Sequence, residues 1–264
     1  SMRRSRVMEK IRAGEAIRIA MTGHVLPPFL AYAAHSGYDC IWLDMEHHPL
    51  DDSEVRTMLA FAQLFDIDVL VRPNTREKMS LGRYLEDGAA GLVIPQVSTA
   101  DEVRDLVSKV KYPPLGDRGM GQPNLQARYG LGAGGDHVHM ADHALRETFL
   151  LVQLETPTGL ANLDEMAAVP GFEGFFVGPT DLDLRMRLEP AERRVSYMDT
   201  LGLLDEACRR HGLVWGSNPA GVEELRAFHA MGARLLMWGA DTGLLRAGLA
   251  SCAGQLDEVT GARG

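Results

Sequence analysis

Two carboxylates stand at the ends of two apolar runs. Glu155 follows the run that ends at Leu154, and Asp181 follows Gly178-Pro179-Thr180 after the run over 174–177. Carboxylate oxygens are preferred ligands of hard divalent cations, and two of them leave about four positions free on an octahedral ion. A 2-oxo acid could fill two of these positions, and the ion would polarise its keto oxygen and stabilise an enolate. The alternative is that each carboxylate caps the helix that follows it.

Arg72 and His47 are the other two candidates for chemistry. Arg72 ends an apolar run just before Pro73, where its guanidinium could donate to an oxyanion or a carboxylate. Pairing with a structural carboxylate is the alternative. His47 follows two acids at the end of another run, and its ordinary pKa suits a general base. A purely structural histidine is the alternative, although Asp87 could orient His47 as a base.

Two other chemistries are less favoured. His137, His139 and His143 have spacing that could bind zinc, but they lie in a segment that we expect to be a solvated loop, with no cysteine nearby. A Schiff-base aldolase needs a lysine at the site. The chain has four lysines, none of them inside or just past an expected strand: Lys10, Lys78, Lys109 and Lys111. Metal-assisted chemistry therefore gains over a covalent route.

Parallel strands would bring these residues together. Short apolar runs without polar alternation are typical of parallel strands buried on both faces. We expect eight of them: Ile17–Met21, Cys40–Leu43, Asp68–Arg72, Gly91–Pro95, Phe149–Leu154, Gly174–Val177, Leu213–Gly216 and Arg234–Trp238. Amphipathic stretches between them predict helices, among them Asp52–Phe65, Asp101–Lys109, one starting at Pro157, Glu223–Met231 and Thr242–Leu256.

This alternation predicts a fold of the α/β class, a (β/α)8 TIM barrel formed as a single domain over 1–264. An open doubly wound sheet is the alternative, but no G-x-G-x-x-G follows the first strand. The segment 111–146, rich in Gly, Pro and His, is expected to be a long irregular loop. Because catalytic groups of TIM barrels lie at the carboxyl ends of the strands, the candidate residues should converge on one face.

Composition narrows the class of partner. The formal net charge is −9, which argues against a nucleic-acid partner. No apolar run approaches the length of a membrane span, and the first residues lack the apolar region of a signal peptide. Three scattered cysteines predict neither a disulfide framework nor a zinc–thiolate site. We expect a soluble cytoplasmic protein with small-molecule partners and no contact with membranes.

Six short motifs, in their order and spacing, resemble those of the HpcH/HpaI aldolases. They are W-L-D-M-E-H over 42–47, V-R-P over 71–73, E-D-G-A over 86–89, Y-P-P with G-D-R-G over 112–119, Q-L-E-T over 153–156 and G-P-T-D-L over 178–182. The likeness runs from about residue 10 to residue 256. The family comprises class II pyruvate aldolases of the 4-hydroxy-2-oxoheptanedioate aldolase type, which reversibly cleave 4-hydroxy-2-oxo acids into pyruvate and an aldehyde.

The resemblance implies roles for individual residues. Glu155 and Asp181 would bind Mg²⁺, Mn²⁺ or Co²⁺. Gln153 and Arg72 would contact the pyruvate part, with Arg72 steadying the enolate oxygen. The backbone N–H groups of Thr180 and Asp181 would hold the pyruvate carboxylate.

Further roles follow from the same resemblance. His47, oriented by Asp87, would move the proton of the substrate's C4 hydroxyl through a metal-bound water. Arg118 and the turn at Gly178-Pro179 are counted with the substrate-binding residues. The family also implies a homo-hexamer, a trimer of dimers, in which the C-terminal helix over 242–256 swaps between paired subunits.

The chain departs from the family where the aldehyde would bind. Thr180 and Asp183 stand where Ala and Ser are common, Arg185–Arg194 is charged, and Gln122-Pro123-Asn124 replaces small residues. The aldehyde, and with it the full substrate, is therefore open. Three alternatives to the aldolase remain: a decarboxylase of oxaloacetate type using the same metal enolate, a non-catalytic metabolite-binding barrel, and a citrate-lyase-like CoA ester lyase. D-M-E-H and Q-L-E-T fit the last one poorly.

Overall fold

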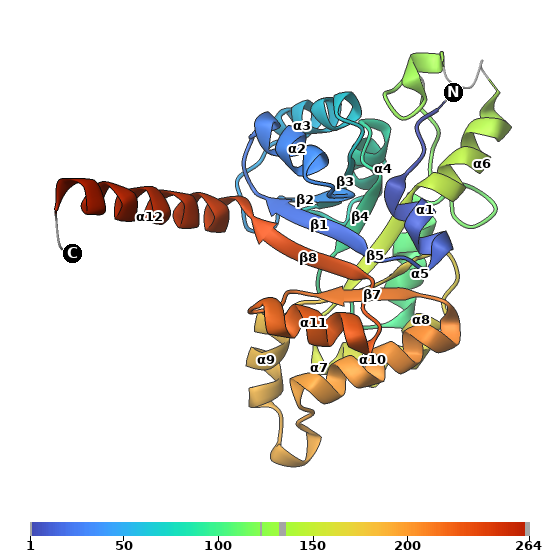
Figure 1. Cartoon of the computed structure of the whole chain (residues 1–264). Coiled ribbons are helices and arrows are strands. Elements are labelled where there is room, and N and C mark those ends of the chain that lie inside the picture. Colours follow the sequence, from blue (N-terminus) through green and yellow to red (C-terminus); the bar gives the residue numbers. More distant parts are fainter. Residues whose placement is uncertain (1, 122, 132–135, 262–264) are drawn as a thin grey trace.

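The computed structural model describes residues 2–121, 123–131 and 136–261. Eight parallel strands, each hydrogen-bonded to the next in sequence order, close into a barrel through the pairing of the last with the first (Figure 1). The strands are β1 (Ile17–Thr22), β2 (Cys40–Asp44), β3 (Asp68–Arg72), β4 (Gly91–Ile94), β5 (Phe149–Leu154), β6 (Gly174–Val177), β7 (Val214–Ser217) and β8 (Leu235–Ala240). The predicted TIM barrel is confirmed, and each predicted strand lies within one or two residues of an observed one.

Two apolar layers explain why the strands lack polar alternation. Alternate residues point into the barrel, where Trp42 and Phe176 pack with their ring centroids 4.7 Å apart. The residues between them, such as Ile41 and Leu43, pack outward against the helices. Because both faces of the sheet are covered, every position of β2, β3 and β5 is buried.

Helices surround the barrel, except for the last one, which projects from it (Figure 1). They are α1 (Arg6–Ala13), α2 (Pro27–His35), α3 (Asp52–Leu64), α4 (Lys78–Glu86), α5 (Ala100–Val110), α6 (His137–Glu147), α7 (Pro157–Ala161), α8 (Leu163–Ala167), α9 (Pro179–Leu188), α10 (Tyr197–His211), α11 (Val222–Met231) and α12 (Asp241–Thr260), with short 3-10 turns η1 (Arg128–Gly130) and η2 (Ala191–Arg193). Capping boxes start α3, between Asp51 and Glu54, and α5, between Thr99 and Glu102. The five predicted helices are confirmed, although the one from Pro157 divides into α7 and α8.

The prediction of an irregular loop over 111–146 was wrong in its last part. Helix α6 begins there, because the Asp136 side chain accepts the N–H of His139 and the helix buries Met140 and Ala144. Only two apolar anchors mark this helix, so its periodicity was too weak to see. His143 Nε2 lies 2.9 Å from the Arg3 carbonyl oxygen, and the described residues contain no group of three or more metal-ligating side chains. Gln122 lies outside the described residues.

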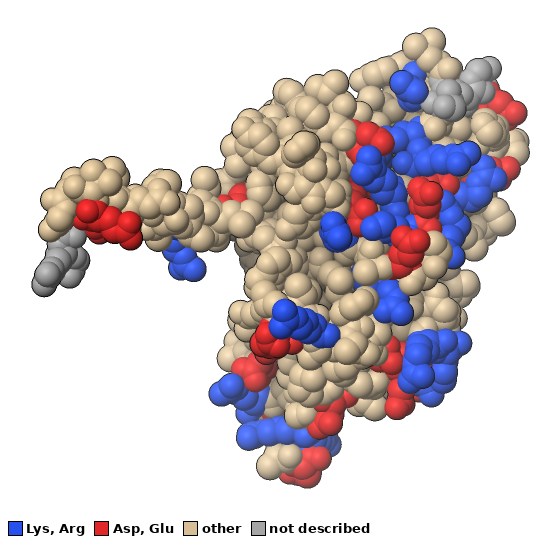
Figure 2. All heavy atoms as spheres, viewed as in Figure 1, with Lys and Arg blue, Asp and Glu red and all other residues tan. Residues whose placement is uncertain are grey.

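Helix α12 projects from the barrel (Figure 1). Leu244, Leu245 and Leu249 are exposed along it, and Figure 2 shows few charged side chains over its surface on this face. An exposed apolar helix of this kind suits contact with a second copy, but swapping between subunits stays a prediction. Among the described residues, no helix is both long and apolar enough to cross a membrane.

Candidate active site

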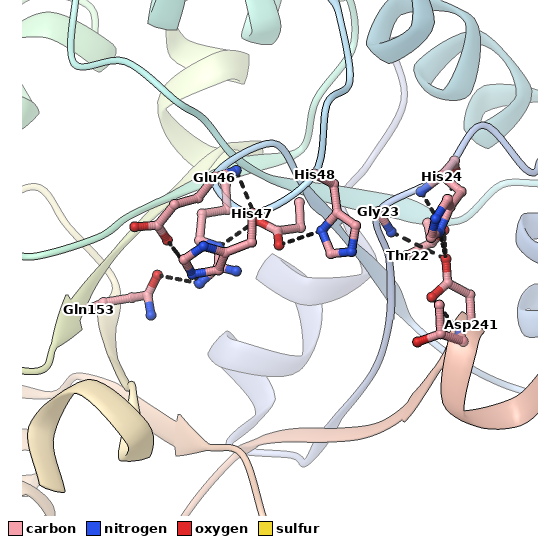
Figure 3. A network of polar contacts seen from close by, with 11 residues as sticks. Thr22, Gly23, His24, Glu46, His47, His48, Gln153 and Asp241 are labelled. Carbon is pink, nitrogen blue, oxygen red and sulfur yellow. Dashed lines mark hydrogen bonds and ion pairs between the residues drawn. The ribbon is translucent and has the colours of Figure 1, made fainter. Parts of the chain in front are cut away.

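Arg72 is the centre of a polar cluster at the carboxyl ends of the strands. Its Nε donates to Asp44 Oδ1 at 2.7 Å, and its Nη1 lies 3.0 Å from Glu46 Oε2 and donates to Gln153 Oε1 at 3.3 Å. The residue is 9 % exposed. The guanidinium fork therefore joins the ends of β2, β3 and β5, and Figure 3 shows Glu46, His47 and Gln153 close to one another. The structural pairing considered for Arg72 is present, within a cluster that also contains His47, Gln153 and Glu155.

Asp44, the last residue of β2, holds the Arg72 guanidinium by a buried ion pair. Burial alone would raise the pKa of its carboxyl. The hydrogen bond and charge of Arg72, with further hydrogen bonds from His48 and the Glu46 N–H, hold that pKa below its ordinary value. Asp44 is therefore an ionised carboxylate, wholly inaccessible to solvent.

Glu155 lies directly after β5 and is 3 % exposed. Its Oε1 accepts the Gln96 N–H at 2.8 Å and its Oε2 accepts from Gln153 Nε2 at 3.3 Å. Burial raises the pKa of the Glu155 carboxyl; the Gln96 hydrogen bond opposes this, while the charges of Glu46 and Asp181 raise it further. Three carboxylates are thus close enough to repel one another, which is the electrostatic setting that a divalent cation relieves.

Gly178 and Pro179 bring Asp181 to Glu155. A Cβ atom on Gly178 would lie 2.3 Å from Glu155 Oε2, so only glycine permits this approach. Gly178 is the N-cap of α9 and Pro179 its first residue. The N–H groups of Thr180 and Asp181 therefore fall in the first turn, where they have no acceptor within the helix and an anion is favoured.

Neither carboxylate acts as the helix cap that the alternative interpretation required. The Thr156 side chain, not Glu155, caps α7 by accepting the Gly159 N–H. Asp181 stands inside the first turn of α9, with its side chain 44 % exposed and Arg185 Nη2 3.7 Å from its Oδ1. The two hard oxygen donors and their excess negative charge fit a divalent cation for which the protein supplies two ligands.

None of the four lysines belongs to this cluster. Each of the four lysines forms an ion pair elsewhere: Lys10 with Asp39, Lys78 with Asp117, Lys109 with Asp105 and Lys111 with Glu173. The Schiff-base route that the sequence disfavoured therefore has no support in the structure.

The structure does not bring Asp87 to His47. Asp87 is the C-cap of α4 and accepts from Arg56 Nε at 3.2 Å. Because α4 runs back from the carboxyl end of β3, its last turn lies at the amino ends of the strands, opposite the site. His47 has a side chain that is 60 % exposed, with Glu46 Oε2 3.6 Å from its Nε2. Within one chain, Glu46 and not Asp87 is the carboxylate beside His47.

Arg118 is also placed away from the cluster. It is 4 % exposed, its guanidinium lies 4.6 Å from the ring centroid of Tyr112, and its Nη2 donates to Gln126 Oε1 at 2.9 Å. Within one chain, its contacts are therefore with Tyr112, with Gln126 and with the Gly82 carbonyl oxygen of α4, to which Nη2 also donates at 3.4 Å. Its G-D-R-G motif could not show on which face of the barrel the side chain lies.

Several residues that lie in the cluster were given no role in the sequence analysis. Asp44, Glu46 and His48 were visible in the D-M-E-H-H run, but only His47 was given a role. Arg185 Nη1 donates to the Glu155 carbonyl oxygen at 3.0 Å, a contact for which the charged segment was the only signal.

Comparison with known proteins identifies the family of this chain. The model of the HpcH/HpaI aldolase/citrate lyase family matches residues 26–247. A hydroxypyruvate/pyruvate aldolase of Pseudomonas aeruginosa is 32 % identical over 257 residues, covering 95 % of this chain and 92 % of that protein. A 2-keto-3-deoxy-L-rhamnonate aldolase of Klebsiella pneumoniae is 32 % identical over 80 % of this chain and 84 % of its own length. The crystal structure of an HpcH/HpaI aldolase from Desulfitobacterium hafniense matches with a TM-score of 0.86 and 25 % identity, covering 98 % of both chains. The chain therefore belongs to the HpcH/HpaI aldolase/citrate lyase family and is an aldolase, a carbon–carbon lyase of that family.

Proposed function

We propose that this aldolase reversibly cleaves a 4-hydroxy-2-oxo acid into pyruvate and an aldehyde, with a divalent cation bound by Glu155 and Asp181. The observation that carries the proposal is the continuous set of contacts from Arg72 through Gln153 to Glu155 at one end of the barrel. The names of the two relatives, a hydroxypyruvate/pyruvate aldolase and a 2-keto-3-deoxy-L-rhamnonate aldolase, support a 2-oxo acid as substrate.

The pyruvate part of the substrate has a natural orientation in this site. Its carboxylate would meet the free N–H groups of Thr180 and Asp181 at the start of α9. Its keto oxygen would then face the Arg72 guanidinium, which donates to the negative charge that develops there during C–C cleavage. Gln153 holds that guanidinium in place. A cation at Glu155 and Asp181 would supply Lewis acidity at the same oxygen.

His47 is the group proposed to accept the proton of the C4 hydroxyl. Its ring is 60 % exposed and lies beside Glu46 (Figure 3). An exposed imidazole can exchange that proton with solvent after the aldehyde leaves. In one chain, Glu46 is the only carboxylate within 4 Å of the His47 ring among the described residues, with its Oε2 3.6 Å from Nε2.

A decarboxylase of oxaloacetate type is the second candidate, because loss of CO₂ gives the same enolate beside Arg72. The test is to incubate the protein with Mg²⁺, Mn²⁺ or Co²⁺, pyruvate and a panel of aldehydes, and to identify the products by mass. Aldol adducts that disappear on chelation and return with metal support the proposal. Release of CO₂ from oxaloacetate with no adduct for any aldehyde would favour the decarboxylase. Trapping of a pyruvate–lysine adduct by borohydride would contradict the metal-dependent route.

We further propose assembly into a homo-hexamer through α12. The exposed leucines of α12 border an apolar groove at the N-terminal end of the helix, which Leu26, Phe29 and Tyr32 of the α2 region also line. The apolar side chains of a projecting helix contribute little hydrophobic stabilisation unless another surface buries them. Light scattering of the intact chain tests this, and a monomer would contradict it.

A further inference from the structure

The polar contacts of Arg72 continue away from the substrate side, through Asp44 to His48. Arg72 Nε donates to Asp44 Oδ1 at 2.7 Å, and His48 Nδ1 lies 2.9 Å from Asp44 Oδ2. Asp44 is ionised and can only accept, so Nδ1 of His48 carries the proton of this hydrogen bond. The two oxygens of one buried carboxylate are therefore held from opposite sides.

The ring of His48 is itself held by the end of β1. A Cβ atom on Gly23 would lie 2.1 Å from the His48 ring, so the ring packs directly on the backbone there. The His24 ring meets it edge-on, with centroids 5.4 Å apart. His24 Nδ1 lies 2.7 Å from Asp241 Oδ2, which also accepts from Thr22 Oγ1 at 2.6 Å. Figure 3 shows this row of side chains running from Glu46 to Asp241, the first residue of α12.

We propose that His48 is a positioning residue for the reaction, which orients the catalytic Arg72 through Asp44. This rests on the proposed function, because that function gives Arg72 its role. Arg72 Nε and the Glu46 N–H both donate to Asp44 Oδ1, at 2.7 and 3.0 Å, so without His48 the carboxylate would be held by one oxygen alone and could turn about it. The His48 donor on Oδ2 prevents this turn. Arg72 needs such a fixed anchor, since a displacement of about 1 Å of a group that stabilises a transition state can cost about 10²-fold in rate.

Two variants separate the hydrogen bond from the packing of the ring. His48→Phe keeps a flat ring against Gly23 but has no donor for Asp44. His48→Asn loses the ring but places an amide N–H at about the position of Nδ1. His211→Phe, at the exposed end of α10, is the matched control for a His-to-Phe change.

The measurement is kcat and KM at saturating Mg²⁺, for aldol cleavage and for oxaloacetate decarboxylation. His48→Phe should lower kcat about 10- to 100-fold in both reactions, the range for losing a hydrogen bond to a charged group, with KM little changed. His48→Asn should recover most of that loss, and His211→Phe should match the wild type.

Three results would overturn the proposal. Wild-type rates in His48→Phe would show that Asp44 needs no second donor. Loss of aldol cleavage alone would make His48 a base at the C4 hydroxyl. Equal defects in the Asn and Phe variants would show that a donor at the position of Nδ1 does not restore the rate, so that the hydrogen bond to Asp44 is not the cause of the effect.

A readout independent of activity separates this proposal from the proposed function. If the wild type performs neither reaction, the proposed function fails, and NMR of the Arg72 Nε–H group still tests the anchor. In the wild type and His48→Asn that proton should be protected from solvent exchange, and in His48→Phe it should exchange at least about tenfold faster. Equal exchange in all three proteins would contradict a positioning role.

Discussion

Replacing Arg72 by lysine should remove catalysis without removing the fold. The guanidinium contacts Asp44, Glu46 and Gln153 at once, at 2.7, 3.0 and 3.3 Å. A lysine ammonium is a single point charge with no planar fork and cannot reproduce these contacts together with one to the substrate. Its charge still compensates the buried Asp44. Arg72→Ala would leave that carboxylate unpaired at about 3–5 kcal/mol of stability, which would confuse folding with catalysis.

The expected loss follows from the role that we propose for Arg72 at the developing oxyanion. Removing one such donor typically lowers kcat by about 10²–10³-fold, equivalent to about 2.7–4 kcal/mol of barrier. Because cleavage and decarboxylation both place negative charge on the same oxygen, Arg72→Lys should slow both by this amount. Substrate binding should weaken much less, since the proposal gives the carboxylate of the substrate to the N–H groups at the start of α9.

The assay is steady-state kinetics of both reactions at saturating Mg²⁺, with thermal unfolding as the check on the fold. Arg209→Lys is the control, because Arg209 forms an exposed ion pair with Asp205 at 2.8 Å on α10. The control should be indistinguishable from the wild type. Activity of Arg72→Lys within a factor of about three of the wild type would refute the role of the fork. A fall in melting temperature with full loss of activity would show instead that Arg72 is structural.

Four further outcomes are expected. His47→Ala should lower aldol cleavage by about 10²–10⁴-fold and spare oxaloacetate decarboxylation, which needs no base at C4; equal losses would make His47 structural. Gly178→Ala should weaken Mn²⁺ binding in calorimetry at least about tenfold, because its Cβ would lie 2.3 Å from Glu155 Oε2, whereas Gly202→Ala has free space and should bind normally; unchanged affinity in Gly178→Ala would show that Glu155 is not a ligand. Asp241 is buried, which alone would raise the pKa of its carboxyl, but its hydrogen bonds hold that pKa below the ordinary value. Its ionised form therefore stabilises the fold above its unfolded pKa of about 3.9, and this contribution is lost as the pH falls through the folded pKa. Denaturant unfolding should show Asp241→Asn less stable than the wild type at neutral pH, with the gap closing in acid; a gap independent of pH would contradict this. Deleting α12 should yield a smaller assembly in sedimentation, and an unchanged mass would exclude α12 from the interface.

The barrel could be predicted from the sequence, because the signals that mark its strands and helices lie within short stretches of the chain. Apolar runs without alternation mark strands covered on both faces, and capping residues such as Asp51 and Thr99 mark where helices start. Helix α6 was not predicted for the same reason: it has too few buried apolar residues to show a helical period in the sequence. Strand-end residues were also predictable as a group, since parallel strands bring their carboxyl ends to one face. Arg72, Gln153 and Glu155 were found in this way.

Tertiary structure alone decided which polar groups meet. Asp87 and Arg118 lie in motifs as distinct as those of Arg72 and Glu155, but helix direction carries Asp87 to the opposite face and packing buries Arg118 against Tyr112. Conversely, Asp44 contacts His48 four residues later and Arg72 on the next strand. No rule of spacing indicates which of its two oxygens each of them takes. Hydrogen bonds depend on differences of a few tenths of an ångström and on side-chain direction. The sequence by itself therefore determined the barrel and the face that holds the site, and only the packed chain determined the partners within it.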